Sequence, residues 1–322
     1  MSSTYYNLSQ IILTSLEYTF IIYKLYFLIN LYFMIGKLCI NTLKGTLSYM
    51  ERKIAFFDID GTLTSEIDGT IPESAVKSIQ AARKNGHLMF LNTGRCMQNV
   101  EQCFRNVGFD GYVCGCGTNI YCTDYDKNNT YKEILYVSQS HNIVEEILFH
   151  ARKFKLDLLF ESKYGVCFDM KKPLITPGGI HQHNQFILRN YDMSHNPEDN
   201  DFVCDKFVVW FSNIQDLNSF RSISDKYFEC IDRGGNFREF VPIGYSKATG
   251  IQVVLDYYHI PIERAYAFGD SNNDLSMLSY VPNSIAMGNA TPTALFNQVS
   301  YVTTNASKNG IENALKHFHF IN

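Results

Sequence analysis

The sequence lacks an excess of charge of either sign, and it lacks the pattern of a disulfide framework. Its 322 residues carry a formal net charge of −4, which argues against broad nucleic-acid binding because such binding rests on dense Lys and Arg surfaces. The nine cysteines are an odd number scattered along a long chain, so we expect reduced thiols in a cytoplasmic protein. Cys114, Cys116 and Cys122 cluster, but no second ligand pair follows at zinc-site spacing.

The first fifty residues differ from the rest. Residues 11–36 form an apolar run whose length suits a membrane helix of about 20 residues, but Lys24 and Asn30 near its middle are costly in hydrocarbon. No small-residue cleavage site follows, which disfavours a signal peptide. Met50 stands just before the first predicted strand, as a start codon would. We therefore interpret residues 1–50 as an over-extended reading frame or a dispensable leader rather than a membrane anchor, and expect membrane contact only if the segment is a true part of the protein.

From residue 53 onward, short apolar strands alternate with helices, which predicts parallel strands joined by crossover helices. The expected fold class is α/β, with a doubly wound, mainly parallel, Rossmann-like sheet. Between 124 and 240 aromatic and polar residues rise and loops interrupt the alternation. We interpret this stretch as an inserted α/β domain, which divides the core domain into 51–123 and 241–322. The predicted core strands are 53–57, 88–91, 112–114, 119–122, 264–268 and 283–287; the core helices are 72–86, 97–107, 246–259, 274–280 and 310–318; the insert has helices 141–155 and 214–227 and strands 156–160, 206–211 and 237–241.

Two acids close the first predicted strand, Asp58 and Asp60, and a Gly-Thr turn follows them. Side chains two apart on a strand point to the same face, and two close carboxylates repel unless a cation or a proton lies between them. Mg²⁺ prefers oxygen ligands and commonly binds together with phosphate. A calcium EF-hand loop would need Gly at the position of Leu63. The motif therefore favours a magnesium-dependent phosphoryl-transfer site, with a structural acidic turn as the alternative.

Three further motifs follow predicted strands or open a helix. Thr93 and Gly94 come directly after the second strand, Lys247 opens the helix after the insert, and an acidic loop from Asp270 to Asp274 ends a later strand. Taken singly, the threonine could cap a helix and the lysine could be a solvated surface residue. Because open α/β sheets bind ligands at the carboxyl ends of their strands, we expect all of these residues to converge there.

The ordered set of Asp58-x-Asp60-Gly-Thr, Thr93-Gly-Arg, Lys247 and Gly-Asp270-x-x-Asn-Asp resembles the haloacid dehalogenase-like phosphatases, in particular the Cof-type members with a large α/β cap. The likeness covers about residues 52–318. The short spacing between the first two motifs leaves room for one helix, whereas the long spacing before Lys247 accommodates a cap domain. Two departures do not touch the chemistry: Cys-Gly-Thr at 116–118 stands where Asn-Gly-Ala is common, and Ala248 stands where Gly is frequent.

The resemblance implies a Mg²⁺-dependent phosphatase that acts on small phosphorylated metabolites, such as sugar phosphates, through an aspartyl-phosphate intermediate. Asp58 would be the nucleophile and Asp60 the general acid and base. The metal would be held by Asp58, the backbone carbonyl of Asp60 and Asp270, with Asp274 in support, and the phosphoryl group by Thr93, Gly94, Lys247 and Asn273. A phosphomutase of related architecture, or a non-catalytic protein that binds a phosphorylated ligand, is the alternative.

The inserted segment is expected to select the substrate. Polar candidates in it are Glu161, Asp169, Lys206, Arg233 and Arg238. The run 207–211 is interpreted as core of the insert rather than as a stacking platform for a ligand. His181, His183 and His195 lie in loop-like sequence and are interpreted as surface residues rather than metal ligands.

Overall fold

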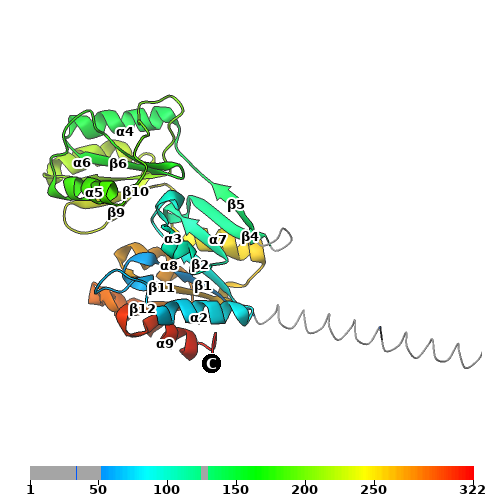
Figure 1. Ribbon diagram of the computed structural model, residues 1–322. Helices are drawn as coiled ribbons and strands as arrows, with labels where there is room; N and C mark the ends of the chain where they lie inside the picture. Colours follow the sequence, from blue (N-terminus) through cyan, green and yellow to red (C-terminus); the bar gives the residue numbers. More distant parts are fainter. Residues whose placement is uncertain (1–33, 35–51, 125–129) are drawn as a thin grey trace, which may run out of the picture. The chain divides into compact units, whose positions relative to one another are not determined.

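The computed structural model describes residue 34 and residues 52–124 and 130–322 (Figure 1). Apart from Met34, the predicted N-terminal extension and its apolar run lie outside the described residues. Lys53–Asn322 forms one compact unit. In the described part of the chain, no helix combines the length and the apolar character that a membrane crossing requires.

The first sheet has eight strands in the order β13-β12-β11-β1-β2-β3-β4-β5. Its central strand β1 lies between β2 and β11 and runs parallel to both. The pairings β3–β4 and β4–β5 are antiparallel. The mainly parallel α/β sheet predicted from the sequence is confirmed. The strands are β1 (Ile54–Phe57), β2 (Leu88–Asn92), β3 (Gly111–Cys114), β4 (Asn119–Asp124), β5 (Thr130–Tyr136), β11 (Ala265–Ser271), β12 (Asn283–Thr291) and β13 (Tyr301–Val302).

Helices cover both faces of this sheet, and the alternation of side chains along β1 explains why. Phe57 belongs to the core on the side of α2 (Glu73–Lys84) and α9 (Gly310–His317), which lie side by side in Figure 1. Phe56 belongs to the core on the side of α7 (Lys247–Tyr258) and α8 (Leu275–Tyr280). Burying each phenylalanine contributes about 1.5–3 kcal/mol. A strand that is apolar on both faces is therefore buried in the middle of the sheet, and this fixes the position of its carboxyl end.

The second sheet has five strands in the order β7-β6-β8-β10-β9, and its neighbouring strands are antiparallel. One face packs against α4 (His141–Lys153) and α6 (Ile214–Ser224) through Phe207 and Val209. The opposite face carries Val208 and Trp210, which cluster with Phe186 of α5 (Pro177–Leu188). The strands are β6 (Asp157–Ser162), β7 (Gly165–Phe168), β8 (Lys206–Trp210), β9 (Phe228–Asp232) and β10 (Phe237–Pro242).

The helix predicted over 97–107 is interrupted. The structure has a 3₁₀ turn at Met97–Asn99, extended backbone at Val100 and Glu101, and a short α3 at Gln102–Arg105. The Arg105 guanidinium donates to the carbonyl oxygens of Val100 and Met97, at 2.8 Å each. These two bonds satisfy backbone acceptors that a continuous helix would have used, so the break costs little.

Helix α5 was not predicted, and it places His181 and His183 on a helix rather than in a loop. Its start is well signalled in retrospect: the Thr176 hydroxyl accepts from the Gly179 amide and a proline follows at the first position. Two glycines follow this proline, and the absence of a Cβ there allows close packing. A Cβ at Gly178 would lie 2.4 Å from Cδ1 of Trp210. Four strands were also not predicted, namely β5, β7, β9 and β13; β5 falls within 124–240 but pairs in the first sheet.

Candidate active site

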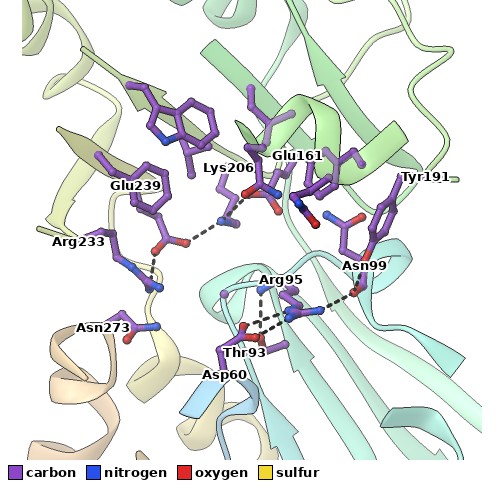
Figure 2. A pocket seen from close by; sticks show the side chains of 18 of the residues that line it. Asp60, Thr93, Arg95, Asn99, Glu161, Tyr191, Lys206, Arg233, Glu239 and Asn273 are labelled. Carbon is purple, nitrogen blue, oxygen red and sulfur yellow. Dashed lines mark hydrogen bonds and ion pairs between the residues drawn. The ribbon is translucent and has the colours of Figure 1, made fainter. Parts of the chain in front are cut away.

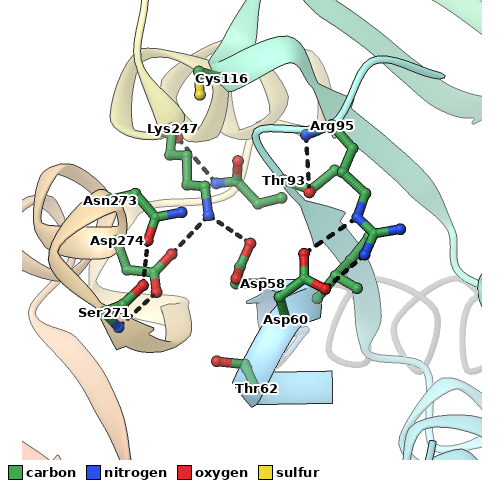
Figure 3. Close-up of polar contacts among 12 residues, drawn as sticks. Asp58, Asp60, Thr62, Thr93, Arg95, Cys116, Lys247, Ser271, Asn273 and Asp274 are labelled. Carbon is green, nitrogen blue, oxygen red and sulfur yellow. Dashed lines mark hydrogen bonds and ion pairs between the residues drawn. The ribbon is translucent and has the colours of Figure 1, made fainter. Parts of the chain in front are cut away.

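The site lies at the carboxyl ends of β1, β2 and β11 (Figure 3). Phe57 is in register with Leu91 of β2 and Phe268 of β11, so the residues that follow on all three strands emerge together. The Asp58 amide still donates to the Phe268 carbonyl at 3.1 Å. The sheet therefore fixes the backbone of Asp58, and the predicted convergence of the motifs follows from parallel register.

Three carboxylates meet at this edge. One oxygen from each of Asp58, Asp270 and Asp274 lies within 4.8 Å of the others. Burial raises the pKa of Asp58 to about 6, opposed by Lys247 and reinforced by Asp274. Burial, followed by the charges of Asp274 and Asp58, raises the pKa of Asp270 to about 8. Both shifts come first from burial and second from the neighbouring carboxylates, and a cation with a preference for oxygen ligands would favour the ionised forms.

Lys247 supplies part of that positive charge. It is the first residue of α7, whose N-cap Ser246 forms a capping box with Thr249. The Lys247 ammonium lies 2.6 Å from Oδ1 of Asp58 and 2.6 Å from Oδ1 of Asp274. Burial opposes its charge, but the two carboxylates raise its pKa above the ordinary value. Lys247 is therefore a buried partner of the nucleophile candidate rather than a solvated surface residue.

The turn after β1 seats Asp270. The Thr62 hydroxyl donates to Oδ1 of Asp270 at 3.0 Å. Gly61 has φ +80°, and a Cβ there would lie 2.3 Å from Oδ2 of the same carboxylate. Asp274 is oriented from its own loop, because its Oδ2 accepts from the amides of Asp270 (2.9 Å) and Ser271 (3.1 Å). The Gly-Thr turn thus allows a carboxylate from another strand to approach the backbone.

Asp60 does not join this cluster. Its carboxylate accepts from Arg95 Nη2 at 2.6 Å and from Nε at 3.2 Å, and its side chain is 65% exposed. β1 ends at Phe57 and the backbone turns at once, so the Asp60 carboxylate pairs with Arg95, although Asp58 and Asp60 both border one cavity, as expected. Arg95 stood in the second motif without an assigned role. Arg95 follows β2, and β2 lies next to β1, which precedes the two acids. This position was the signal that could have identified Arg95 as a partner of Asp60.

The predicted phosphate ligands line a cavity of about 470 Å³ (Figure 2). Thr93, Gly94 and Asn273 all border it, as do Asp58 and Asp60. Thr93 is fixed at its place because its hydroxyl accepts from the amide of residue 95 at 3.1 Å. Lys247 reaches the site from behind Asp58 rather than from the cavity lining.

The second sheet and α5 supply the rest of the lining. Of the five polar candidates, Glu161, Lys206 and Arg233 border the cavity. Asp169 and Arg238 do not, and they pair instead with Arg152 at 2.7 Å and Asp232 at 2.9 Å. Sequence reasoning missed several lining residues from the second sheet, from α5 and its C-terminal flank, and from the turn after β2: Glu239, Phe237, His181, Gln182, Gln185, Phe186, Arg189, Tyr191 and Asn99. The unpredicted α5 accounts for four of them.

Comparison with known proteins agrees with this geometry. A model of the haloacid dehalogenase-like hydrolase family matches residues 55–315. The chain is 25% identical over 294 residues to 5-amino-6-(5-phospho-D-ribitylamino)uracil phosphatase YitU of Bacillus subtilis, covering 84% of this chain and 99% of that one. It is 24% identical over 255 residues to HMP-PP phosphatase of Cronobacter sakazakii, covering 76% and 86%.

The fold has counterparts among solved structures. BT1666 from Bacteroides thetaiotaomicron, a phosphatase of the haloalkanoate superfamily, superposes with a TM-score of 0.71 at 23% identity, covering 85% of this chain and 97% of that structure. The family match spans most of the chain and includes all four motifs. The resemblance inferred from the motifs is thereby confirmed: the chain belongs to the haloacid dehalogenase-like hydrolases.

Proposed function

We propose that this protein is a Mg²⁺-dependent phosphatase that hydrolyses small phosphorylated metabolites through an aspartyl-phosphate intermediate. The observation that carries the proposal is the position of Asp58. It lines the cavity, it is only 3% exposed, and its carboxylate is held by Lys247 beside two further acids. The phosphatase names of the relatives support the same reaction class.

The residues present suit a divalent cation. When all three carboxylates are ionised, their three negative charges exceed the single positive charge of Lys247, and one divalent ion would balance the excess. Asp58, Asp270 and the backbone carbonyl of Asp60 would hold Mg²⁺, with Asp274 in support, and oxygen ligands of this kind suit that ion. When bound, Mg²⁺ would neutralise the carboxylates and withdraw charge from the phosphoryl oxygens.

In the first step a carboxylate oxygen of Asp58 attacks phosphorus, and the bond from phosphorus to the ester oxygen breaks. The leaving oxygen takes a proton from Asp60, which must first move from its resting pair with Arg95. In the second step Asp60 removes a proton from water, the water oxygen attacks phosphorus, and the bond to Asp58 breaks to release inorganic phosphate. Donors at Thr93, Gly94, Lys247 and Asn273 would stabilise the charge on the transferring group.

We also propose that the second sheet with α4, α5 and α6 is a cap over the core site. Its residues supply most of the lining of the cavity, so its closure would exclude water other than the attacking molecule. On this assignment the insert corresponds to residues 124–240, with β5 as the strand of the first sheet that leads into it.

The test is a phosphate-release screen over phosphorylated metabolites and p-nitrophenyl phosphate, with Mg²⁺ or with EDTA. We expect release only with Mg²⁺, and none from Asp58→Asn, which keeps the shape of the side chain but removes the nucleophilic carboxylate. Asp205→Asn is the matched control, because Asp205 is a buried carboxyl that accepts from Tyr136 at 2.8 Å and lies outside the cavity lining. Turnover by Asp58→Asn at the wild-type rate would refute the proposal. Accumulation of free phosphate would separate the phosphatase from a phosphomutase.

A further inference from the structure

Arg233 is a basic side chain of the second sheet that borders the cavity from the turn between β9 and β10. Gly234 and Gly235 continue this turn at φ +88° and +50°, a backbone conformation that glycine adopts without strain. β9 also contacts the 3₁₀ turn Asn272–Asp274, which follows β11 of the first sheet. Figure 2 shows the Arg233 side chain directed towards Asn273, one of the predicted phosphate ligands. A cation of the second sheet therefore approaches the phosphate ligands of the first.

Glu239 of β10 holds Arg233 in this position. Its Oε2 accepts from Nη1 of Arg233 at 3.2 Å, and its Oε1 accepts from the Lys206 ammonium at 2.6 Å. The same carboxylate lies against the first sheet. A Cβ at Gly94 would lie 3.0 Å from Oε1 of Glu239, and the Cys116 thiol donates to this oxygen at 3.4 Å. The carboxylate that binds Arg233 is thus packed against the loop that carries the predicted phosphate ligand Gly94.

Arg233 keeps part of its hydrogen-bonding capacity free. Nη1 is used for Glu239, and no acceptor for Nε or Nη2 is found within the part of the chain that the structure describes. Arg95 uses these same two nitrogens for its bidentate contact with Asp60. The Arg233 side chain is 28% exposed and borders the cavity. Two parallel N–H groups of a guanidinium match the spacing of two phosphate oxygens, so a phosphoryl group suits the free edge of Arg233.

The charge of the site calls for a further cation. Three ionised carboxylates, the Lys247 ammonium and one bound divalent ion sum to zero, whereas a phosphate monoester brings up to two negative charges. Arg233 is close enough to respond to the nucleophile: burial opposes its charge, but the charges of Glu239 and then Asp58 raise its pKa above the ordinary value. A preorganised cation at this place stabilises the charge of the transition state without rearrangement.

We infer that Arg233 is a further catalytic residue, whose Nε and Nη2 donate to oxygens of the transferring phosphoryl group. This inference rests on the proposed phosphatase function and adds one residue to its mechanism. While the bond from Asp58 to phosphorus forms and the bond to the ester oxygen breaks, Arg233 stabilises the charge on the phosphoryl oxygens and neither gives nor takes a proton. The second sheet thereby completes a site that the first sheet begins. Because every monophosphate ester carries this group, Arg233 contributes to the rate with all of them.

The first test asks whether the contact is to the phosphoryl group or to the leaving group. Arg233→Ala and the wild type, both with Mg²⁺, are given p-nitrophenyl phosphate and the best metabolite ester of the phosphate-release screen. We expect kcat/KM to fall about 100-fold or more, by the same factor for both esters. A loss confined to the metabolite ester would assign Arg233 to the leaving group and overturn the inference, as would an unchanged kcat/KM for both.

The second test measures binding without a leaving group. Orthovanadate mimics the transferring phosphoryl group, and its Kd with Mg²⁺ is measured by titration calorimetry. We expect Kd to rise about 100-fold in Arg233→Ala and about tenfold in Arg233→Lys, which keeps the charge but offers a single nitrogen. Arg238→Ala is the matched control, because Arg238 belongs to the same hairpin, lies 2.9 Å from Oδ1 of Asp232, and is outside the cavity lining. Its Kd should equal that of the wild type.

The outcomes separate the inference from the proposed function. A wild-type Kd for orthovanadate in Arg233→Ala would overturn the contact while leaving the phosphatase function intact. If Arg233→Ala fails to fold, Arg233→Lys decides, because it keeps a cation for Glu239; a wild-type Kd and wild-type kcat/KM in that variant would overturn the inference equally. No release of phosphate by the wild-type protein from any ester, p-nitrophenyl phosphate included, would instead refute the proposed function, and the role of Arg233 with it.

Discussion

The excess of negative charge at the carboxylate cluster predicts how the stability of the metal-free protein depends on pH. The folded-state pKa of Asp270 is about 8, well above its ordinary value of 3.8, and that of Asp58 is raised as well. Folding therefore favours the protonated carboxyl. The stability that this contributes is fully present below the ordinary pKa, and it is lost as the pH rises through the folded-state value. Without metal, the protein should become less stable from pH 5 to pH 8.5.

The magnitude follows from the shift of Asp270 alone. About four pKa units at about 1.4 kcal/mol per unit give about 6 kcal/mol. About 4 kcal/mol of this is lost between pH 5 and pH 8.5, because the unfolded carboxyl titrates near pH 3.8 and about 2 kcal/mol is already lost below pH 5. For a chain of this size, a loss of about 4 kcal/mol lowers Tm by roughly 10 °C.

Magnesium should reverse the trend, because it binds the ionised carboxylates and so stabilises more as the pH rises. The assay is thermal unfolding followed by circular dichroism, at pH 5 to 8.5, with EDTA or with saturating Mg²⁺. Asp205 supplies an internal complication, since burial raises its pKa to about 7, but it lies outside the metal cluster. Its contribution is the same in both solutions, so it cancels in the difference between the two Tm values.

The difference in Tm between Mg²⁺ and EDTA should therefore widen with pH in the wild type and in Asp205→Asn. It should stay small in Asp270→Asn, which removes the carboxylate with the largest shift. A difference that is constant with pH in the wild type, or that persists unchanged in Asp270→Asn, would show that the three acids do not form a shared cation site.

Three further predictions concern single side chains. Gly61→Ala should weaken Mg²⁺ binding about tenfold or more, because its Cβ would displace the Asp270 carboxylate. Gly69→Ala controls for backbone strain, since Gly69 also has a positive φ but lies in open space. Equal losses of Mg²⁺ affinity in the two variants, measured by titration calorimetry, would contradict this. Lys247→Met should lower the free energy of unfolding of the metal-free protein by about 3–5 kcal/mol, measured by urea unfolding at neutral pH, because it leaves buried carboxylates without their partner. Mg²⁺ should restore part of the lost stability. A variant as stable as the wild type in EDTA would contradict the prediction. Arg95→Ala should lower kcat about tenfold or more in steady-state assays, because Asp60, the proposed acid and base, would lose the two hydrogen bonds that keep its carboxylate at the cavity between catalytic steps. An unchanged kcat would show that Arg95 does not position Asp60.

The positions where the strands end could be predicted from the sequence. They depend only on the apolar pattern along each strand and on the register of neighbouring parallel strands. Apolar runs that end in Asp58, Thr93 and Asp270 identified three parallel strands, and parallel strands must bring their carboxyl ends to one edge. The position of Lys247 at the start of the helix after the insert was predicted, whereas its burial was not. Local pattern was sufficient wherever the sheet itself fixes the position of a residue.

The remaining features depend on contacts that local pattern does not encode. The Asp60 side chain lies outside the carboxylate cluster and accepts two hydrogen bonds from Arg95, which follows β2, and no spacing rule reports that pairing. The helix α5 was missed because Gly178 and Gly179 imitate a loop while serving close packing on Trp210 and Asp157. The predicted set of residues that line the cavity was incomplete for the same reason. The position of α5 and the pairing of Lys206 with Glu239 both depend on tertiary structure.

A short segment of the chain connects the cavity lining to Lys247, the lysine that contacts Asp58. Glu239 of β10 borders the cavity, accepts from the Cys116 thiol at 3.4 Å, and precedes by a short stretch the start of α7 at Lys247. One short segment thus joins a residue of the cavity lining to the lysine whose ammonium contacts Asp58. Because so few residues separate them, the position of β10 constrains where the first turn of α7 can lie, and with it the position of Lys247.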